Sequence, residues 1–133
     1  MRVWEEQKME SLTDNLRFED DESGVIFNHY SFCELVKHIM VKYGKISYDL
    51  ATNKLNNSDL IKMPKSINEV LFLTHELEFH WAMLLTYGNM YWTKGIPSDF
   101  NEFKEEYFAW EEEIKRKYKL KESYRYYDKM TDE

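Results

Sequence analysis

Apolar positions recur every three or four residues along most of the chain, which is the spacing of one face of an α-helix. The longest such run extends from residue 66 to about residue 92, where apolar side chains occupy two helical faces and leave little polar surface. A helix of that character belongs in the middle of a domain. The pattern therefore predicts a mainly α fold, a compact helical bundle of four to five helices around a long central helix.

Two helix starts carry a recognisable polar signal. Ser31 is followed three residues later by Glu34, and Ser66 is followed by Glu69. In this capping box the serine oxygen accepts a hydrogen bond from the third helical amide, while the glutamate reaches back to the cap amide. We therefore expect helices to start at Ser31 and Ser66, the first ending at Gly44 in a left-handed cap.

Three further helices are predicted from shorter patterns. Residues 3–16 and 46–55 each place apolar side chains at helical spacing, and the last helix has Ser98 as its N-cap and aromatic residues repeating as far as Tyr118. The tyrosine-rich tail from Lys121 is expected to fold back over the bundle. No repeat or linker divides the chain, so residues 1–133 are expected to form a single helical domain.

A different pattern precedes the first capping box. Two short apolar triplets, residues 16–18 and 25–27, flank an acidic stretch. That stretch contains Glu19, Asp20, Asp21 and Glu22. The arrangement predicts either an acidic loop or a small N-terminal β-hairpin with a charged tip.

Composition narrows the classes of protein that fit. Only 4 glycines and 2 prolines among 133 residues argue against a loop-rich β fold. The single cysteine, Cys33, cannot form an internal disulfide, so we expect a reducing, cytoplasmic setting and a buried structural thiol. No stretch approaches the length of about 18 apolar residues that a membrane span needs. The formal net charge of -7 repels phosphate and favours a basic protein partner over nucleic acid.

The histidines and nearby glutamates are the candidate metal ligands in the sequence. His75 and His80 are five residues apart, which places them about 140° apart around a helix, so they cannot grip one metal ion together. Glu34 with His38, and Glu76 with His80, lie four apart and could meet across two facing helices. Such pairs are common on ordinary helices, and Glu34 belongs to a capping box. We predict no metal and no cofactor.

Catalytic motifs are also missing from the sequence. The four glycines are scattered, so no glycine-rich loop is available to cradle a phosphate. Nothing marks Cys33 as a nucleophile, because an orienting base and an oxyanion site cannot be identified. The expectation is that the protein is not an enzyme.

Acidic residues gather on one side of the last predicted helix, away from its aromatic residues. They are Glu102, Glu105, Glu106, Glu112 and Glu113. Together with the acidic stretch at residues 19–22, they could offer carboxylates to the lysines and arginines of a partner. Tyr91 and Trp92, at the end of the predicted central helix, are candidate aromatic anchors for the same partner, with packing over the core as the alternative.

In overall character the chain resembles the immunity proteins of bacterial toxin–immunity pairs, which are small, acidic and without catalytic residues. The resemblance is one of type over the whole length and transfers no site residue. It implies a cytoplasmic inhibitor that neutralises a cationic toxin such as a nuclease, without binding nucleic acid or membrane. Two alternatives remain: a structural or phage-type accessory protein that self-assembles through its tyrosine-rich tail, and a helix-bundle protein that holds a metal or small ligand.

Overall fold

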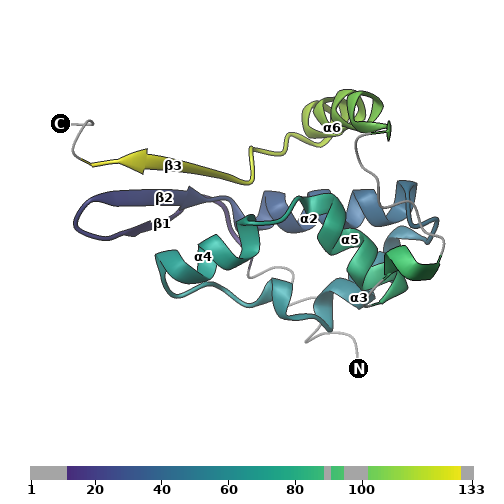
Figure 1. Cartoon of the computed structure of the whole chain (residues 1–133), viewed down its shortest axis with the longest axis horizontal. Helices are drawn as coiled ribbons and strands as arrows, with labels where there is room; N and C mark the ends of the chain where they lie inside the picture. Colours follow the sequence, from purple (N-terminus) through teal and green to yellow (C-terminus); the bar gives the residue numbers. More distant parts are fainter. Residues whose placement is uncertain (1–11, 89–90, 95–101, 130–133) are drawn as a thin grey trace.

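The computed structural model describes residues 12–88, 91–94 and 102–129, and within them the fold is mainly α with one small sheet (Figure 1). The elements in chain order are β1 (Leu16–Glu19), β2 (Ser23–Phe27), α2 (His29–Lys42), α3 (Tyr48–Asn56), η1 (Asp59–Ile61), α4 (Ile67–Thr74), α5 (Glu78–Tyr87), η2 (Tyr91–Lys94), α6 (Lys104–Tyr118) and β3 (Tyr124–Asp128). Of the predicted helix at residues 3–16, residues 3–11 lie outside the described part, and Leu16 begins a strand.

The sheet has three antiparallel strands in the order β1-β2-β3. Val25 of the central strand lies opposite Phe18 on one side and Tyr126 on the other. The third strand is formed by the tyrosine-rich tail, in place of the predicted return over the helices. The predicted two-stranded hairpin was therefore incomplete, because its pairing partner lies about a hundred residues further along the chain.

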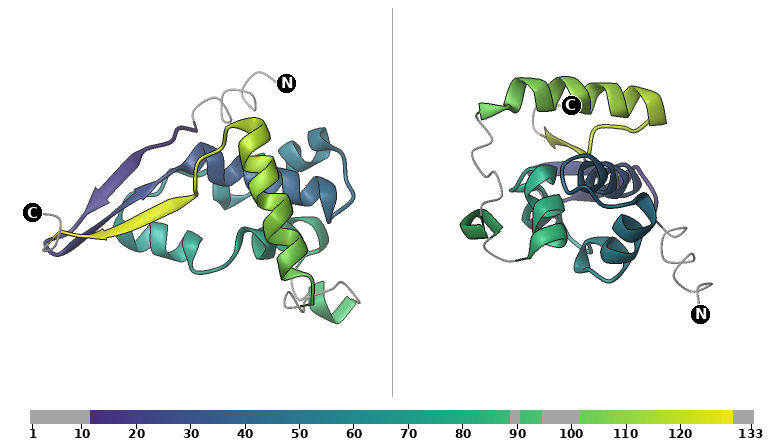
Figure 2. Two further views of the ribbon diagram at one scale, coloured as in Figure 1. Left: turned by 90° about the horizontal axis from the view of Figure 1, so that it is seen from above. Right: turned by 90° about the vertical axis from the view of Figure 1, so that its right-hand side faces the viewer.

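The central helix of the domain is α2, and the prediction of a bundle around residues 66–92 is wrong in this respect. Ten residues of α2 are buried, including Phe32, Val36 and Ile39. In Figure 2, α6 crosses on one side of α2, and α3 and α5 lie on the other. Burial of its apolar side chains from several directions makes α2 the main source of hydrophobic stabilisation.

The run from residue 66 to 92 is broken into α4 and α5, since Leu77 has an extended backbone with ψ 150. A side chain occupies a carbonyl that a continuous helix would pair with a backbone amide, since Trp81 Nε1 donates to Leu73 O at 2.8 Å. Thr74 Oγ1 donates to Val70 O at 2.9 Å. These bonds satisfy the last turn of α4 and allow α5 to turn back against α2.

The two capping boxes have different outcomes. At Ser66 the helix start is confirmed, because the serine oxygen accepts from Glu69 N and caps α4. The Glu69 side chain, however, accepts from the amide of Lys65 and not from that of Ser66. At Ser31 it is wrong, because α2 already starts at His29 and Ser31 lies inside the helix. Its amide and hydroxyl both donate to Asp14, at 2.9 and 2.8 Å, so a carboxylate from another segment takes the place of the cap.

Gly44 has a different role from the one predicted. The residue with positive φ after α2 is Lys45, with φ 59, and not Gly44. A Cβ at position 44 would lie 2.6 Å from Met40 O and 2.9 Å from the side chain of Thr86. Glycine is therefore required there, because the Met40 carbonyl at the end of α2 and the Thr86 side chain of α5 leave no space for a Cβ.

The remaining helix predictions concern α3 and α6. Residues 46–55 correspond to α3, whose N-cap Ser47 accepts from Leu50 N. α6 starts at Lys104, and the predicted N-cap Ser98 lies outside the described residues. Cys33 is fully buried, as expected, and burial raises the pKa of its thiol.

Candidate partner-binding surface

The acidic stretch of residues 19–22 lies at the turn between β1 and β2. Two of its four carboxylates, those of Glu19 and Asp20, form contacts within the protein. Asp20 Oδ1 accepts from the amides of Glu22 and Ser23 and so builds the turn. These hydrogen bonds lower the pKa of the Asp20 carboxyl. Glu19 accepts a hydrogen bond from Tyr127 at 2.5 Å, which lowers its pKa, with a further contribution from Lys129. Within the described residues, only the carboxylates of Asp21 and Glu22 in this stretch have no hydrogen-bond or ion-pair partner.

The acidic ridge, defined as Glu102, Glu105, Glu106, Glu112 and Glu113, lies on α6 and the turn just before it. All five side chains are exposed, as the helical spacing predicted. Within the part of the chain that the structure describes, none of them forms an ion pair. The ridge is therefore available to cations from outside the molecule.

Glu111 of the same helix is not part of the ridge and lies inside the protein. It is buried, accepts from the hydroxyl of Tyr107 at 2.9 Å and lies 3.3 Å from the ammonium group of Lys115. Burial raises the pKa of Glu111, and the charge of Lys115 offsets part of that effect. The four-residue spacing of these three residues on the apolar side of the helix was the available signal.

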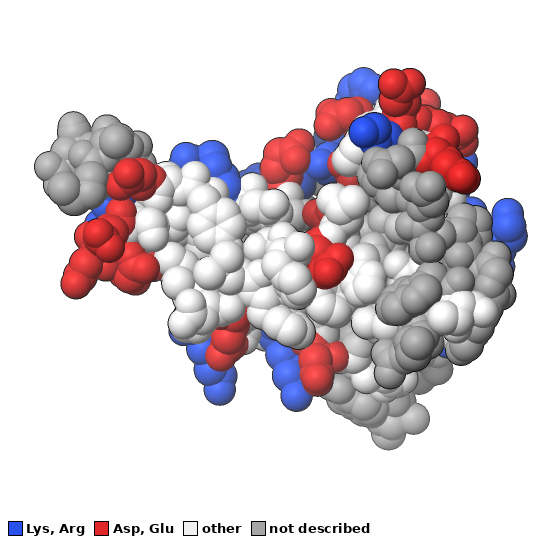
Figure 3. All heavy atoms as spheres, viewed as in Figure 1, with Lys and Arg blue, Asp and Glu red and all other residues white. Residues whose placement is uncertain are grey.

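The structure does not bring the two acidic regions together. Figure 3 shows red carboxylates at the left end, where β1 meets β2, and again over α6 at the upper right. A mostly uncharged face lies between them in this view. A single small contact surface can therefore include the ridge or the turn, and not both.

The predicted aromatic anchors do not form an exposed pair. Tyr91 lies in η2 with only 5% of its surface exposed, and its hydroxyl is 3.1 Å from His80 Nδ1. Tyr91 therefore packs against the core, which was the alternative interpretation. The side chain of Trp92 lies outside the described part of the structure.

The candidate metal ligands are engaged in other contacts. Glu34 lies 2.7 Å from the ammonium of Lys37 and accepts from the hydroxyl of Tyr48 at 2.9 Å. The imidazole of His38 is stacked on Tyr118, with ring centroids 4.3 Å apart, and burial lowers its pKa. This arrangement joins α2, α3 and α6 and serves as a polar link between helices.

His75 and His80 are separated by the break between α4 and α5. His75 is exposed, and its Nδ1 contacts the carbonyl of Phe72. His80 is half-buried. No group of three or more histidine, cysteine, aspartate or glutamate side chains suited to a metal ion occurs among the described residues.

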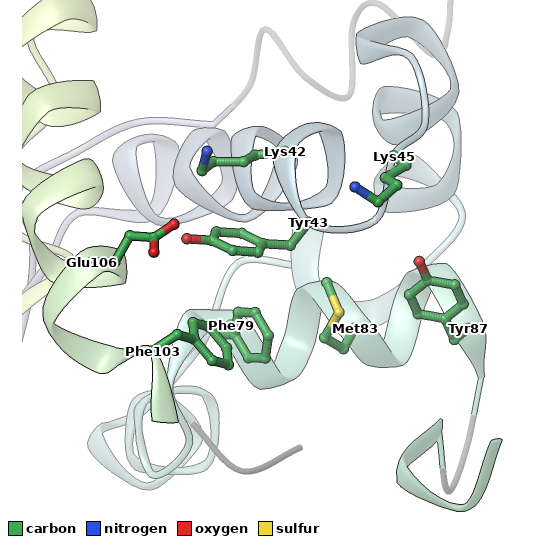
Figure 4. A pocket seen from close by; sticks show the side chains of 8 residues that line it. All are labelled: Lys42, Tyr43, Lys45, Phe79, Met83, Tyr87, Phe103 and Glu106. Carbon is green, nitrogen blue, oxygen red and sulfur yellow. The ribbon is translucent and has the colours of Figure 1, made fainter. Parts of the chain in front are cut away.

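A pocket that the sequence did not predict adjoins the acidic ridge (Figure 4). It has a volume of about 520 Å³ and lies between the end of α2, α5 and the start of α6. Its lining residues are Lys42, Tyr43, Lys45, Phe79, Met83, Tyr87, Phe103 and Glu106. Phe79 packs edge-on against both Tyr43 and Phe103, at centroid distances of 5.5 and 5.4 Å. We call this site the aromatic pocket.

The hydroxyl of Tyr43 is the unusual group in the aromatic pocket. Its oxygen is buried and has no hydrogen-bond partner within the described structure. Figure 4 shows the hydroxyl and the carboxylate of Glu106 pointing toward one another. Burial raises the pKa of Tyr43, and the negative charge of Glu106 adds to the effect, so the phenol stays protonated at neutral pH. An incoming polar atom could satisfy this hydroxyl.

The arrangement of charge around the aromatic pocket is mixed. Lys42 Nζ lies 5.4 Å from the ring centre of Tyr43 and 5.9 Å from that of Trp110, so its charge rests on aromatic faces. Glu106 belongs both to the pocket and to the acidic ridge. The ridge and the pocket therefore form one continuous surface, an apolar hollow beside a row of carboxylates.

Comparison of the chain with protein-family models, with curated proteins and with solved structures found no match. In the described ranges, none of the helices has both the length and the apolar character to cross a bilayer.

Proposed function

We propose that this protein acts by binding a basic protein partner, without chemistry of its own, through the acidic ridge and the adjoining aromatic pocket. The observation that carries the proposal is the double role of Glu106, which joins a row of exposed carboxylates to an apolar hollow. Protein interfaces commonly combine a buried apolar anchor with a charged rim.

The ridge supports a cationic partner. Its five carboxylates are exposed and form no internal ion pair in the described chain, and the whole protein carries a net charge of -7. Complementary charge speeds association and selects basic over acidic partners. Carboxylates that meet lysine or arginine side chains across an interface also fix the orientation of the two proteins.

The aromatic pocket supports an anchor residue. Aromatic rings and Met83 make up most of its lining, and the buried Tyr43 hydroxyl has no hydrogen-bond partner among the described residues. A largely apolar partner side chain with a polar end would remove this apolar surface from water and satisfy the hydroxyl. The partner surface that fits is thus one apolar residue surrounded by cations.

Within this class, an inhibitor of a cationic toxin, such as the immunity protein of a nuclease, is the narrower proposal. A nuclease must present basic residues to phosphate, and a row of carboxylates can occupy that basic surface. Inhibition of this kind needs no catalytic group in the inhibitor.

The test is capture of partners on the tagged protein, followed by affinity measurement with the purified partner. Two variants with equal change of net charge are compared: Glu112→Gln with Glu113→Gln on the ridge, and Asp21→Asn with Glu22→Gln at the β1–β2 turn. We expect the partner to be basic, and the ridge variant to lower the association rate and its salt dependence more than the turn variant. An acidic partner, or equal effects of both variants, contradicts the proposal.

Tyr43→Phe tests the pocket separately. The change removes an oxygen that has no hydrogen bond in the described structure, so stability should be unchanged or raised. Affinity should fall several-fold, because the partner loses its hydrogen bond with the hydroxyl. Unchanged affinity would show that the anchor does not enter this pocket.

A further inference from the structure

β3 is the outer strand of the sheet, and its free edge can be located from the register. The hydrogen bonds from Asn28 N to Ser123 O and from Lys129 N to Glu22 O mark the two ends of the β2–β3 ladder. In an antiparallel pair, hydrogen-bonded and non-hydrogen-bonded positions alternate. It follows that Arg125 and Tyr127 bond to β2, whereas the amides and carbonyls of Tyr124 and Tyr126 point away from it.

An unpaired strand edge is a template for another strand. Among the residues that the structure describes, no strand lies beyond β3. A proline at Tyr126 would block this edge, but the strand contains none. The open groups at Tyr124 and Tyr126 can therefore accept an added strand without disturbing the bonds to β2.

The side chains beside this edge form an exposed apolar face. Tyr124 and Tyr126 have exposed fractions of 41% and 38%, and their rings are 5.5 Å apart. Tyr126 is held next to α4 by a 3.2 Å contact between its hydroxyl and Thr74 Oγ1. Leu71, one helical turn before Thr74, and Leu77, in the break after α4, are also exposed. Figure 3 shows an uncharged face over this part of the molecule.

We propose that two copies of this chain pair through β3, antiparallel, with Tyr126 opposite Tyr126 of the second copy. The two sheets then form one continuous six-stranded sheet, and the apolar faces of the two copies meet beneath it. The contact is isologous, so it closes as a dimer and leaves the sheet no further free edge at β3.

The choice of register follows from charge. With Tyr126 at the centre, each Arg125 lies opposite Tyr127 of the second copy, and Arg125 already lies 5.5 Å from its own Tyr127 ring. Moving the centre by one residue toward the N-terminus places Arg125 opposite Arg125. Moving it by one residue toward the C-terminus places Arg125 opposite Lys129. Both alternatives set like charges across the strands, which is unfavourable.

In Figure 2 most of the helices extend from one end of the sheet, whereas α4 lies alongside β3, in keeping with the contact between Thr74 and Tyr126. A two-fold axis at Tyr126 turns the second copy end for end, so α2, α3, α5 and α6 of the two copies lie at opposite ends of the joined sheet, and the two α4 helices lie beneath it. The acidic ridge stays exposed, and this proposal does not depend on the proposed function.

The first test is a cysteine cross-link. In hydrogen-bonded antiparallel pairs the Cα atoms are about 5.5 Å apart, within the reach of a disulfide. Tyr126→Cys should therefore form a covalent dimer with oxidised glutathione, whereas two copies of Tyr124→Cys would lie about 14 Å apart along the strands and should not. The native Cys33 is buried and does not compete. Equal cross-linking of the two variants would overturn the proposed register.

The second test is sedimentation equilibrium over a range of protein concentrations. The wild type should dimerise, and Tyr126→Pro should be at least tenfold weaker than the matched Tyr126→Ala, which loses the same ring but keeps the amide. Circular dichroism checks that both variants fold. A wild type that is monomeric at every concentration overturns the proposal. A dimer that is weakened equally by the proline and alanine variants also overturns it. The same holds if the β3 amides are protected from hydrogen exchange only when another protein is added.

Discussion

The two faces of α6 carry the same type of residue in opposite situations. On the inner face, Glu111 is buried between Tyr107 and Lys115 and accepts a hydrogen bond from the Tyr107 hydroxyl. On the outer face, the glutamates of the acidic ridge are exposed and have no internal ion pair in the described chain. A buried carboxylate requires partners within the fold, whereas an exposed one is free to meet a partner protein. Substitutions on the inner face should therefore change the stability of the fold, and substitutions on the outer face should change partner binding.

The largest effect is expected for Lys115→Met. Lys115 lies 3.3 Å from Glu111 and 2.9 Å from Glu122. Burial alone would lower its pKa, but the contacts with Glu122 and Glu111 raise it. Removing the cation leaves the buried carboxylate of Glu111 without a counter-charge, which should lower the unfolding free energy by about 3 kcal/mol. This value is at the lower end for buried ion pairs, because Glu122, the other partner of Lys115, is exposed to solvent. Urea unfolding measures this, with the exposed Arg116→Met as the control, for which a change under about 0.5 kcal/mol is expected.

Tyr107→Phe should have the next largest effect. The Tyr107 ring is fully buried, and its hydroxyl donates to Glu111 at 2.9 Å. Its loss leaves a carboxylate oxygen without a donor and should lower the unfolding free energy by about 1–3 kcal/mol. Tyr118→Phe removes a hydroxyl from an exposed tyrosine of the same helix and serves as the comparison. Similar losses in both variants would show that the inner network contributes little.

The pH dependence of Glu111→Gln sharpens the comparison. Because burial raises the pKa of Glu111 above 4.5 in the folded state, the folded protein holds a proton that the unfolded chain has released. This contribution therefore makes the wild type more stable as pH falls from neutrality toward 4.5. The glutamine variant lacks it, so the difference in unfolding free energy should move in favour of the wild type on acidification. Thermal unfolding at several pH values measures this difference, and a shift in the other direction would contradict the assignment.

The smallest effect on stability is expected on the outer face. Glu112→Gln with Glu113→Gln removes two exposed charges and should change the unfolding free energy by less than about 0.5 kcal/mol. The same pair of changes is the one expected to weaken partner binding. A loss of several kcal/mol would mean that the ridge belongs to the fold.

Local sequence signals predicted local structure well. Ser66 and Glu69 fall at the start of α4, and α3 lies where the short apolar pattern placed it. The exposure of the acidic ridge also followed from helical spacing alone. These features depend on residues within one or two turns of each other, which is the range that periodicity and capping signals cover.

The features that were missed depend on distant residues. The break after Thr74 has no proline or glycine and is stabilised by the indole of Trp81, which lies in the next helix. The true start of α2 depends on Asp14, and β3 has tyrosines without strict alternation. The aromatic pocket is assembled from three helices. No local pattern encodes such contacts, so sequence reasoning cannot supply them.

The first turn of α2 has a consequence for folding kinetics. There Ser31 receives an amide hydrogen bond from Lys121, 90 residues away, while donating to Asp14, and Asn28 donates to the carbonyl of Glu122. Contacts between such remote parts of a chain slow the search for the native state. We therefore expect this mostly helical protein to refold at the pace of a mixed α/β domain rather than in the microseconds typical of simple helical bundles.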